Sequence, residues 1–505
     1  MKHVVKDMGG GVLVLAVPPV AATFVLWLSR LNEITLFEFA GAAGLLAAAW
    51  IPYYQWKKAG ERYLPIFPML SFMYWVYYAL ALFWGNRRGY TAHGEVPHGA
   101  IEQAMLLALV GVLCLWIGKW TRVGQRLVSL KTIDIEATRE STWSYIRTVL
   151  LLSIPLTFMV QSRAYLFGSG GRQFVVLLTS IVPMGLFVLL FRKLLRRQAD
   201  HGEVLLIVVF LVARFLAGIA SGWLGVSVAI MITCMVAYIY EQRKIPAVAV
   251  ALILAYVLFF QAGKGAFRKV FWGERVDSTL SQRISFWSSE SFRTWDATLE
   301  NPNESNLRRL ADQNLGRLSL LQQTAHVLEM TPDIVPYQHG QLYSYMLVTL
   351  IPRALWPDKP SVNDANRFYQ VAYGLTDPDQ LETVSIAVGT VAESFINFGW
   401  WGPFLIMIPV GIFFDYFQHA FLARDSGAVM NAIGIALIPT FLAVESQLAQ
   451  YFAGISQSIV VVLLVLWPVL RMRYRAGTAT RRQERTPSLA GEIRIPLAVP
   501  RRRFL

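Results

Sequence analysis

Residues 345–360 read Tyr-Met-Leu-Val-Thr-Leu-Ile-Pro-Arg-Ala-Leu-Trp-Pro-Asp-Lys-Pro and lie inside a long polar segment, 263–397. Apolar runs occupy most of the chain on both sides of this segment, nine before it and three after it. The sequence therefore predicts a membrane protein with one large insertion that faces water. We expect that insertion, and the helix ends beneath it, to carry the chemistry.

Composition places the chain among membrane proteins. Of its 505 residues 55% are apolar and 15% are charged, and the mean hydropathy is +0.45, outside the usual range of a soluble domain. Runs of about twenty apolar residues, long enough to cross about 30 Å of hydrocarbon, recur along it. Because these runs are continuous rather than alternating, they predict helices and not barrel strands. The two cysteines, Cys114 and Cys234, are too few for a disulfide framework.

We predict an all-α fold, a polytopic membrane bundle of about twelve helices with one large helical loop outside the membrane. The predicted spans are 11–29, 34–54, 64–85, 100–118, 144–162, 174–191, 203–220, 222–240, 245–262, 399–417, 427–446 and 448–470. The predicted regions are an N-terminal membrane region (1–262), the loop (263–397), a C-terminal membrane region (398–470) and a tail (471–505).

The distribution of Lys and Arg between alternate connections predicts the orientation of the bundle. The basic set holds Lys2, Lys6, Lys57, Lys58, Arg62, Lys119, Arg122, Arg126, Lys131, Arg139, Arg192, Lys193, Arg196, Arg197, Arg243, Lys244 and Arg424. The other set holds Arg30, Arg87, Arg88, Arg163 and Arg172. Because basic connections stay in the cytoplasm, both termini are expected there and the 263–397 loop on the opposite side.

The net charge of +14 is not a nucleic-acid signal, because much of it lies in the tail. Residues 471–505 contain ten Arg and two Glu and follow the last span directly. Such a tail is attracted to anionic cytoplasmic lipid. Because it has three prolines and little periodicity, we expect it to be disordered.

The loop is expected to be structured. Asn301-Pro302 followed by Glu304 resembles a helix start, and Pro332 closes the same helix. Between them Leu307, Leu310, Leu318, Leu321 and Leu328 form one apolar stripe at helical spacing. We expect this helix to pack its apolar stripe against its own loop.

Four stretches of the loop resemble the Wzy-type polymerases of oligosaccharide repeat units. They are Leu315-Gly-Arg-Leu-Ser-Leu-Leu321, Tyr337-Gln-His-Gly340 with Tyr343, Ile351-Pro-Arg-Ala-Leu-Trp-Pro-Asp-Lys-Pro360 and Glu393-Ser-Phe-Ile-Asn-Phe-Gly399. The resemblance covers about 155 residues around the loop. It implies a GT-C-like inverting glycosyltransferase of the bacterial inner membrane, which acts on polyprenyl-diphosphate-linked oligosaccharide without a metal or a nucleotide sugar. Partners would be the bilayer and a chain-length regulator, with no nucleic acid.

Three cations suit the leaving diphosphate that this chemistry produces. Without a metal, guanidinium and ammonium groups must take the negative charge that develops on it. Arg353 and Lys359 lie in a turn stiffened by three prolines, and Arg317 has a planar fork suited to phosphate oxygens. Arg317 and Arg353 are our catalytic candidates, and Lys359 is a substrate-binding candidate. The structural alternative is pairing with Asp358, Asp364 or Glu329.

The acceptor hydroxyl needs a base, for which Glu393 and His339 are the candidates. Glu393 lies in an apolar run that should enter the membrane from the loop side, where burial favours a neutral carboxyl group. His339 is the alternative, although a lone His in a turn is commonly just hydrogen-bonded. Arg214 lies in the middle of an apolar run and should face the bundle interior, where it meets either the diphosphate or another helix.

Three other functions stay open, and one of them is a purely structural role as a partner in a glycan-export complex. A flippase or exporter usually has internal symmetry and short loops, which the 9 + 3 division of spans does not match. A lipid-linked glycan ligase uses the same substrate and is not excluded by the residues. The sequence has no metal-ligand spacing, phosphate loop or serine elbow, so no cofactor is expected.

Overall fold

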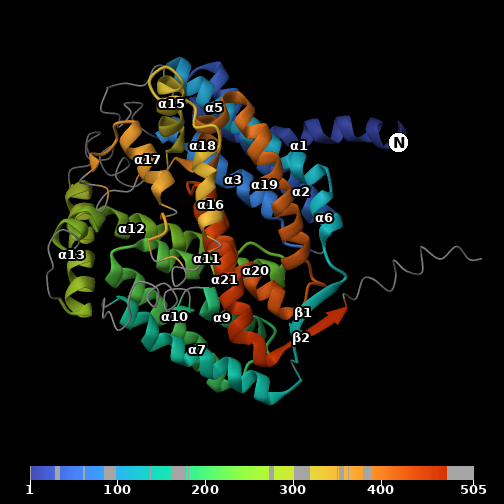
Figure 1. Ribbon diagram of the computed structural model, residues 1–505, viewed down its shortest axis with the longest axis vertical. Coiled ribbons are helices and arrows are strands. Elements are labelled where there is room, and N and C mark those ends of the chain that lie inside the picture. The colour runs from blue at the N-terminus through green and yellow to red at the C-terminus, as the bar shows by residue number, and fades with distance from the viewer. Residues whose placement is uncertain are drawn as a thin grey trace, which may run out of the picture.

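The protein is a helical bundle with one small sheet, seen here in a computed structural model (Figure 1). The structure describes residues 2–28, 34–60, 63–84, 98–136, 138–161, 178–179, 181–271, 278–300, 319–349, 351, 356, 358–361, 363–378, 381, 386 and 388–474. The predicted helix start at Asn301 and the cations Arg317 and Arg353 lie outside these residues. The expectation of an all-α polytopic membrane fold is met apart from one short strand pair.

The first half of the chain supplies most of the long apolar helices. Its elements are α1 (Lys2–Leu28), α2 (Leu36–Ala59), α3 (Ile66–Tyr74), the π-helix η1 (Trp75–Ala79), α4 (Leu80–Trp84), α5 (His98–Trp120), α6 (Val123–Leu127), β1 (Lys131–Ile135), α7 (Glu140–Gln161), α9 (Ile181–Leu195), α10 (His201–Ser221), α11 (Leu224–Gln242) and α12 (Ala247–Phe271).

The second half supplies the loop helices and the last spans. Its elements are α13 (Leu280–Glu300), α15 (Leu320–Met330), η3 (Gln341–Tyr343), α16 (Ser344–Thr349), α17 (Asp364–Ala372), α18 (Gly389–Phe398), η5 (Gly399–Trp401), α19 (Gly402–Phe421), α20 (Ala428–Leu442), α21 (Leu448–Leu466), η6 (Trp467–Val469) and β2 (Leu470–Tyr474). The loop is therefore structured, as expected.

Eight helices among the described residues are long and apolar enough to cross a membrane. Two shorter apolar helices, Leu15–Leu28 and Ala428–Leu442, add to them. The protein is thus an integral membrane protein, because each such helix satisfies its own backbone in hydrocarbon. The helices α7 and α9 also coincide with predicted spans but do not reach the same length and apolarity over their described residues.

Contacts between connections divide the helix ends into two sides. On the sheet side, Tyr63 pairs with Ala423, the Arg243 guanidinium lies 5.1 Å from the Trp56 ring, and β1 pairs with β2. On the loop side, the Thr35 hydroxyl donates to Glu102 at 2.6 Å. Each of these contacts joins two connections that the distribution of Lys and Arg assigns to the same side of the membrane. In Figure 1 the sheet lies toward the lower end of the longest axis and α15 lies at the upper end.

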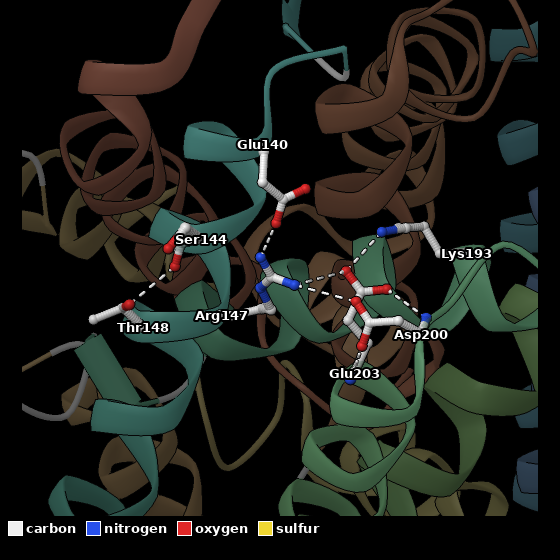
Figure 2. Close-up of polar contacts among 7 residues, drawn as sticks. All are labelled: Glu140, Ser144, Arg147, Thr148, Lys193, Asp200 and Glu203. Carbon is white, nitrogen blue, oxygen red and sulfur yellow. Dashed lines mark hydrogen bonds and ion pairs between the residues drawn. The ribbon is translucent and has the colours of Figure 1, made fainter.

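Ion pairs join the helices on the sheet side (Figure 2). Arg147 of α7 lies among three carboxylates: it pairs with Glu140, with Asp200 at 3.2 Å and with Glu203 at 3.8 Å. Lys193 of α9 donates to the buried Glu203 carboxylate from the other side, at 2.6 Å. Two basic residues from different helices therefore share one acid of α10, which fixes α7, α9 and α10 relative to one another.

Two boundaries differ from the sequence prediction. The tail was expected to be disordered from residue 471, but residues 470–474 form β2 in an antiparallel pair with β1. The ion pairs of Arg471 with Glu136 (2.7 Å) and Arg473 with Asp134 (3.6 Å) account for the difference, because they neutralise the start of the basic tail. The helix α12 also continues to Phe271, past the predicted boundary at 262.

Candidate functional site

Glu393 lies at the centre of α18 and caps a neighbouring helix. Its side chain is fully buried, and its Oε2 accepts a hydrogen bond from the backbone N–H of Leu448 at 2.8 Å. Leu448 is the first residue of α21, so the carboxyl group meets the positive end of a helix dipole. The expected burial of Glu393 is confirmed, and its partner is a helix N-terminus 55 residues further along the chain.

Asn397 joins the two motifs on which the resemblance rests. Its Nδ2 donates to the Glu393 carbonyl at 2.9 Å, and its Oδ1 accepts from the N–H of Gly340 at 3.0 Å. The carbonyl groups of Ile396 and Asn397 accept from the N–H groups of Gln338 and His339. The turn at 337–340 is therefore bound along the end of α18, so that two stretches far apart in the sequence form one unit.

His339 and Tyr343 lie on this unit with opposite exposure. His339 is exposed and has a left-handed backbone with φ of 49°, whereas Glu393 is fully buried. The Tyr343 ring stacks on Phe398, and its hydroxyl is buried without a hydrogen-bond partner among the described residues. Burial and the nearby Glu393 carboxyl raise the pKa of Tyr343 well above its ordinary value. This buried hydroxyl is thus a neutral donor beside α18.

A second acid, Glu445, approaches the site from the connection between α20 and α21. The same connection is held to α18, because the Thr390 hydroxyl donates to the Ser446 carbonyl at 3.0 Å. Glu445 is partly exposed and lies near the Tyr77 hydroxyl and the Lys264 ammonium group. Burial raises the pKa of Glu445, against the smaller opposing effects of Tyr77 and Lys264.

Sequence reasoning missed Glu445 because it placed that residue inside the predicted span 427–446. The usable signal was an acid at the end of an apolar run, on the same predicted side as Glu393. Tyr77 was equally hidden, since aromatic residues near span ends are usually interfacial. Its position on the π-helix η1 fits the frequent use of such bulges at functional sites.

An apolar pocket lies directly beneath these groups, between α3, α5, α18, α19, α20 and α21. Its lining includes Tyr74, Thr390, Phe413, Leu448, Tyr451 and Phe452. Thr390 is one turn before Glu393, and Leu448 is the residue that hydrogen-bonds its carboxylate. The pocket is small, about 20 Å³, and it is lined by neighbours of the two acids and not by the acids themselves.

Two of the predicted cationic residues have structural partners. Lys359 is buried, and its ammonium group donates to the carbonyls of Ile351 (2.6 Å) and Val348 (3.3 Å) at the end of α16. A cation there is favoured by the helix dipole. The Arg214 guanidinium donates to the Thr179 carbonyl at 2.8 Å. Contact of either residue with phosphate stays a prediction and would require an exchange of these bonds.

The fold and this geometry define a polytopic helical membrane protein with a polar site beside an apolar pocket. Residues 129–438 match the family described as Domain of unknown function (DUF8712), which is more than half of the chain, and the protein belongs to that family. The match includes Glu393 and ends before Glu445. No curated protein matches the chain, and no solved structure does.

Proposed function

We propose that this protein is a polymerase of lipid-linked oligosaccharide repeat units in the synthesis of a bacterial surface polysaccharide. It would transfer the growing chain from polyprenyl diphosphate to a sugar hydroxyl of a new lipid-linked repeat. In this proposal it is a twelve-span, GT-C-like enzyme of the inner membrane, with both termini cytoplasmic and the 263–397 loop outside. A chain-length regulator and other export proteins are its expected partners.

One observation carries the proposal. The segments 337–340 and 393–399, on which the resemblance depends, are hydrogen-bonded to each other through Asn397. They lie beside Glu393 and close to the connection that carries Glu445, at the ends of apolar helices. Such a site suits a substrate that is part isoprenoid and part sugar, because the two parts need adjacent apolar and polar surroundings.

The proposal divides the reaction between the loop and the bundle. The loop cations Arg353 and Arg317 stabilise the diphosphate as the bond to the anomeric carbon breaks. The first isoprene units of the carrier lie against the apolar faces of the membrane helices, which sets the position of that bond. The second lipid-linked repeat brings its sugar hydroxyl to the polar side of α18.

The test is a polymerisation assay with the full-length protein in liposomes. The probe is the mixture of lipid-linked repeat units that a strain lacking the gene accumulates, extracted and supplied without other enzymes. The wild-type protein should produce a ladder of longer lipid-linked chains on a gel. Arg353→Ala should abolish the ladder while the protein still inserts, because no other charge replaces the guanidinium at the diphosphate.

Arg293→Ala is the matched control, since that side chain is 77% exposed and paired only locally with Glu290 among the described residues. It should leave the ladder intact. If Arg353→Ala also makes a normal ladder, the proposed site is wrong. If the wild type makes no ladder but moves single repeats across the bilayer, the protein is a flippase. Transfer only to a different acceptor lipid would identify a ligase.

A further inference from the structure

Glu393 lies too deep in the protein to receive a proton directly from a bound sugar. Its side chain has no exposed surface, and the N–H of Leu448 occupies one carboxylate oxygen. The other oxygen, Oε1, is buried among the described residues and has no hydrogen-bond partner there. A general base must come within about 3 Å of the hydroxyl that it deprotonates, or reach it through one water. Glu393 meets neither condition in this arrangement.

Glu445 lies in the connection between α20 and α21, three residues before Leu448, and is accessible. Its connection is fixed on both sides, because the Thr390 hydroxyl donates to the Ser446 carbonyl (3.0 Å) and the Tyr451 hydroxyl donates to the Ala443 carbonyl (2.6 Å). The carboxyl group is partly exposed, whereas that of Glu393 is closed off. A substrate can therefore reach Glu445 without opening the bundle.

We propose that Glu445 is the catalytic base of the polymerase and that Glu393 is a positioning residue that holds the base in place. This inference rests on the proposed function. The acceptor hydroxyl oxygen forms a bond to the anomeric carbon of the donor while its proton passes to the Glu445 carboxylate. The bond between that carbon and the diphosphate oxygen breaks, and the lipid diphosphate leaves with the electron pair.

The neighbours of Glu445 suit this role. The Tyr77 hydroxyl of η1 lies close to the carboxylate, and Lys264 of α12 favours its charged form. Tyr451 of α21 also lies close to it. Side chains from three elements thus lie around the carboxyl group of the base.

The protonation state of Glu445 predicts the pH dependence of the reaction. The carboxyl must be ionised to accept a proton, so the rate falls as the pH drops through its pKa. Because burial raises that pKa, the fall should begin at a higher pH than for an ordinary glutamate. Tyr77, Lys264 and Tyr451 are the titratable groups that face the carboxyl, and only Lys264 among them carries charge near neutral pH.

The experiment compares Glu445→Gln, Glu445→Ala and Glu393→Gln in the same liposome assay. Loss of the base should lower the initial rate of chain lengthening by about 10²–10⁴-fold in both Glu445 variants. Formate should restore part of the activity of Glu445→Ala, because a small carboxylate can occupy the space of the missing one. Glu300→Gln, an exposed acid at the end of α13, is the control and should keep the wild-type rate.

The outcomes test the assignment of Glu445 as the base separately from the proposed function. If the wild type does not polymerise, the function fails and the inference with it. If the wild type polymerises, the inference makes three requirements. The acid limb of the pH–rate profile must be retained in Glu393→Gln and lost from the residual rate of Glu445→Gln. Formate must restore part of the activity of Glu445→Ala. Near-normal activity of Glu445→Ala, or an acid limb that disappears only in Glu393→Gln, would overturn the inference while leaving the function intact.

Discussion

At the scale of single residues, the loop side of the protein uses polar side chains to bind free backbone groups. Glu393 accepts a hydrogen bond from the first N–H of α21, and Asn397 accepts one from the N–H of Gly340. Lys359 donates to carbonyl groups at the end of α16. A buried backbone group that loses such a partner raises the free energy of the folded state, because the interior has a low dielectric constant. The sequence correctly predicted that Glu393 is buried, but its partner could not be predicted because it is 55 residues away.

Glu393→Ala should destabilise the protein. The change leaves the N–H of Leu448 buried without an acceptor, which costs about 1–3 kcal/mol. Thermal unfolding of the purified protein in detergent, followed by tryptophan fluorescence, should show a lower Tm. Glu393→Gln should lower the Tm less, since the amide oxygen can still accept the same hydrogen bond. Equal Tm values for wild type and Glu393→Ala would contradict the capping role.

At the scale of elements, the sequence predicted the helices better than their ends. Hydrophobic runs show where a helix crosses hydrocarbon, so every predicted span coincides with a helix over its described residues. The apolar run ends at residue 262, but the helix α12 itself continues to Phe271. The strand pair was also missed, because β1 and β2 lie far apart in the sequence and their register is set only by their contact.

Two helices of the bundle are in backbone contact through glycines. A Cβ atom on Gly411 of α19 would lie 2.2 Å from the Leu115 carbonyl oxygen of α5, and one on Gly118 would lie 2.3 Å from the Ile408 carbonyl oxygen. Small residues allow such close approach between membrane helices, where hydrophobic burial gives little drive to associate. The α5–α19 contact matters for the site, because α19 follows α18 after only three residues.

Gly411→Ala should therefore force α5 and α19 apart. Overpacking of this kind costs about 1–3 kcal/mol, and the Tm should fall together with the rate of chain lengthening. Gly185→Ala in α9 is the matched control, because no atom of the described residues lies within 4 Å of its Cβ position. That change should keep or raise the Tm, since Ala favours helix more than Gly does. Similar Tm values for the two variants would refute the close packing of α5 and α19.

At the scale of the whole molecule, the candidate site is assembled from three segments, and the sequence pointed to two of them. The segments 337–340 and 393–399 stood out by their motif residues, whereas 443–448 did not. A connection of a few residues between two apolar runs has no periodicity of its own. Its importance comes from where α20 and α21 place it, beside α18 and above the pocket. Arrangement in space, not composition, makes it part of the site.

The division into two sides makes a prediction about accessibility in cells. The positive-inside rule predicts that the sheet side lies in the cytoplasm and the loop side on the opposite side of the membrane. Two exposed positions report on it: Ile334 on the loop side, 69% exposed, and Met472 in β2, 79% exposed. Each can be changed to Cys in a chain whose own cysteines, Cys114 and Cys234, are replaced by Ser.

A membrane-impermeant maleimide added to intact spheroplasts should label Ile334→Cys and leave Met472→Cys unlabelled. Both should react after the membrane is opened with detergent, which controls for folding and for reactivity of the thiols. Labelling of both positions from outside would contradict the two-sided arrangement. The reverse pattern would put Glu445 and the α18 motifs in the cytoplasm, where the translocated lipid-linked repeat is absent, and the polymerase proposal would then fail on location alone.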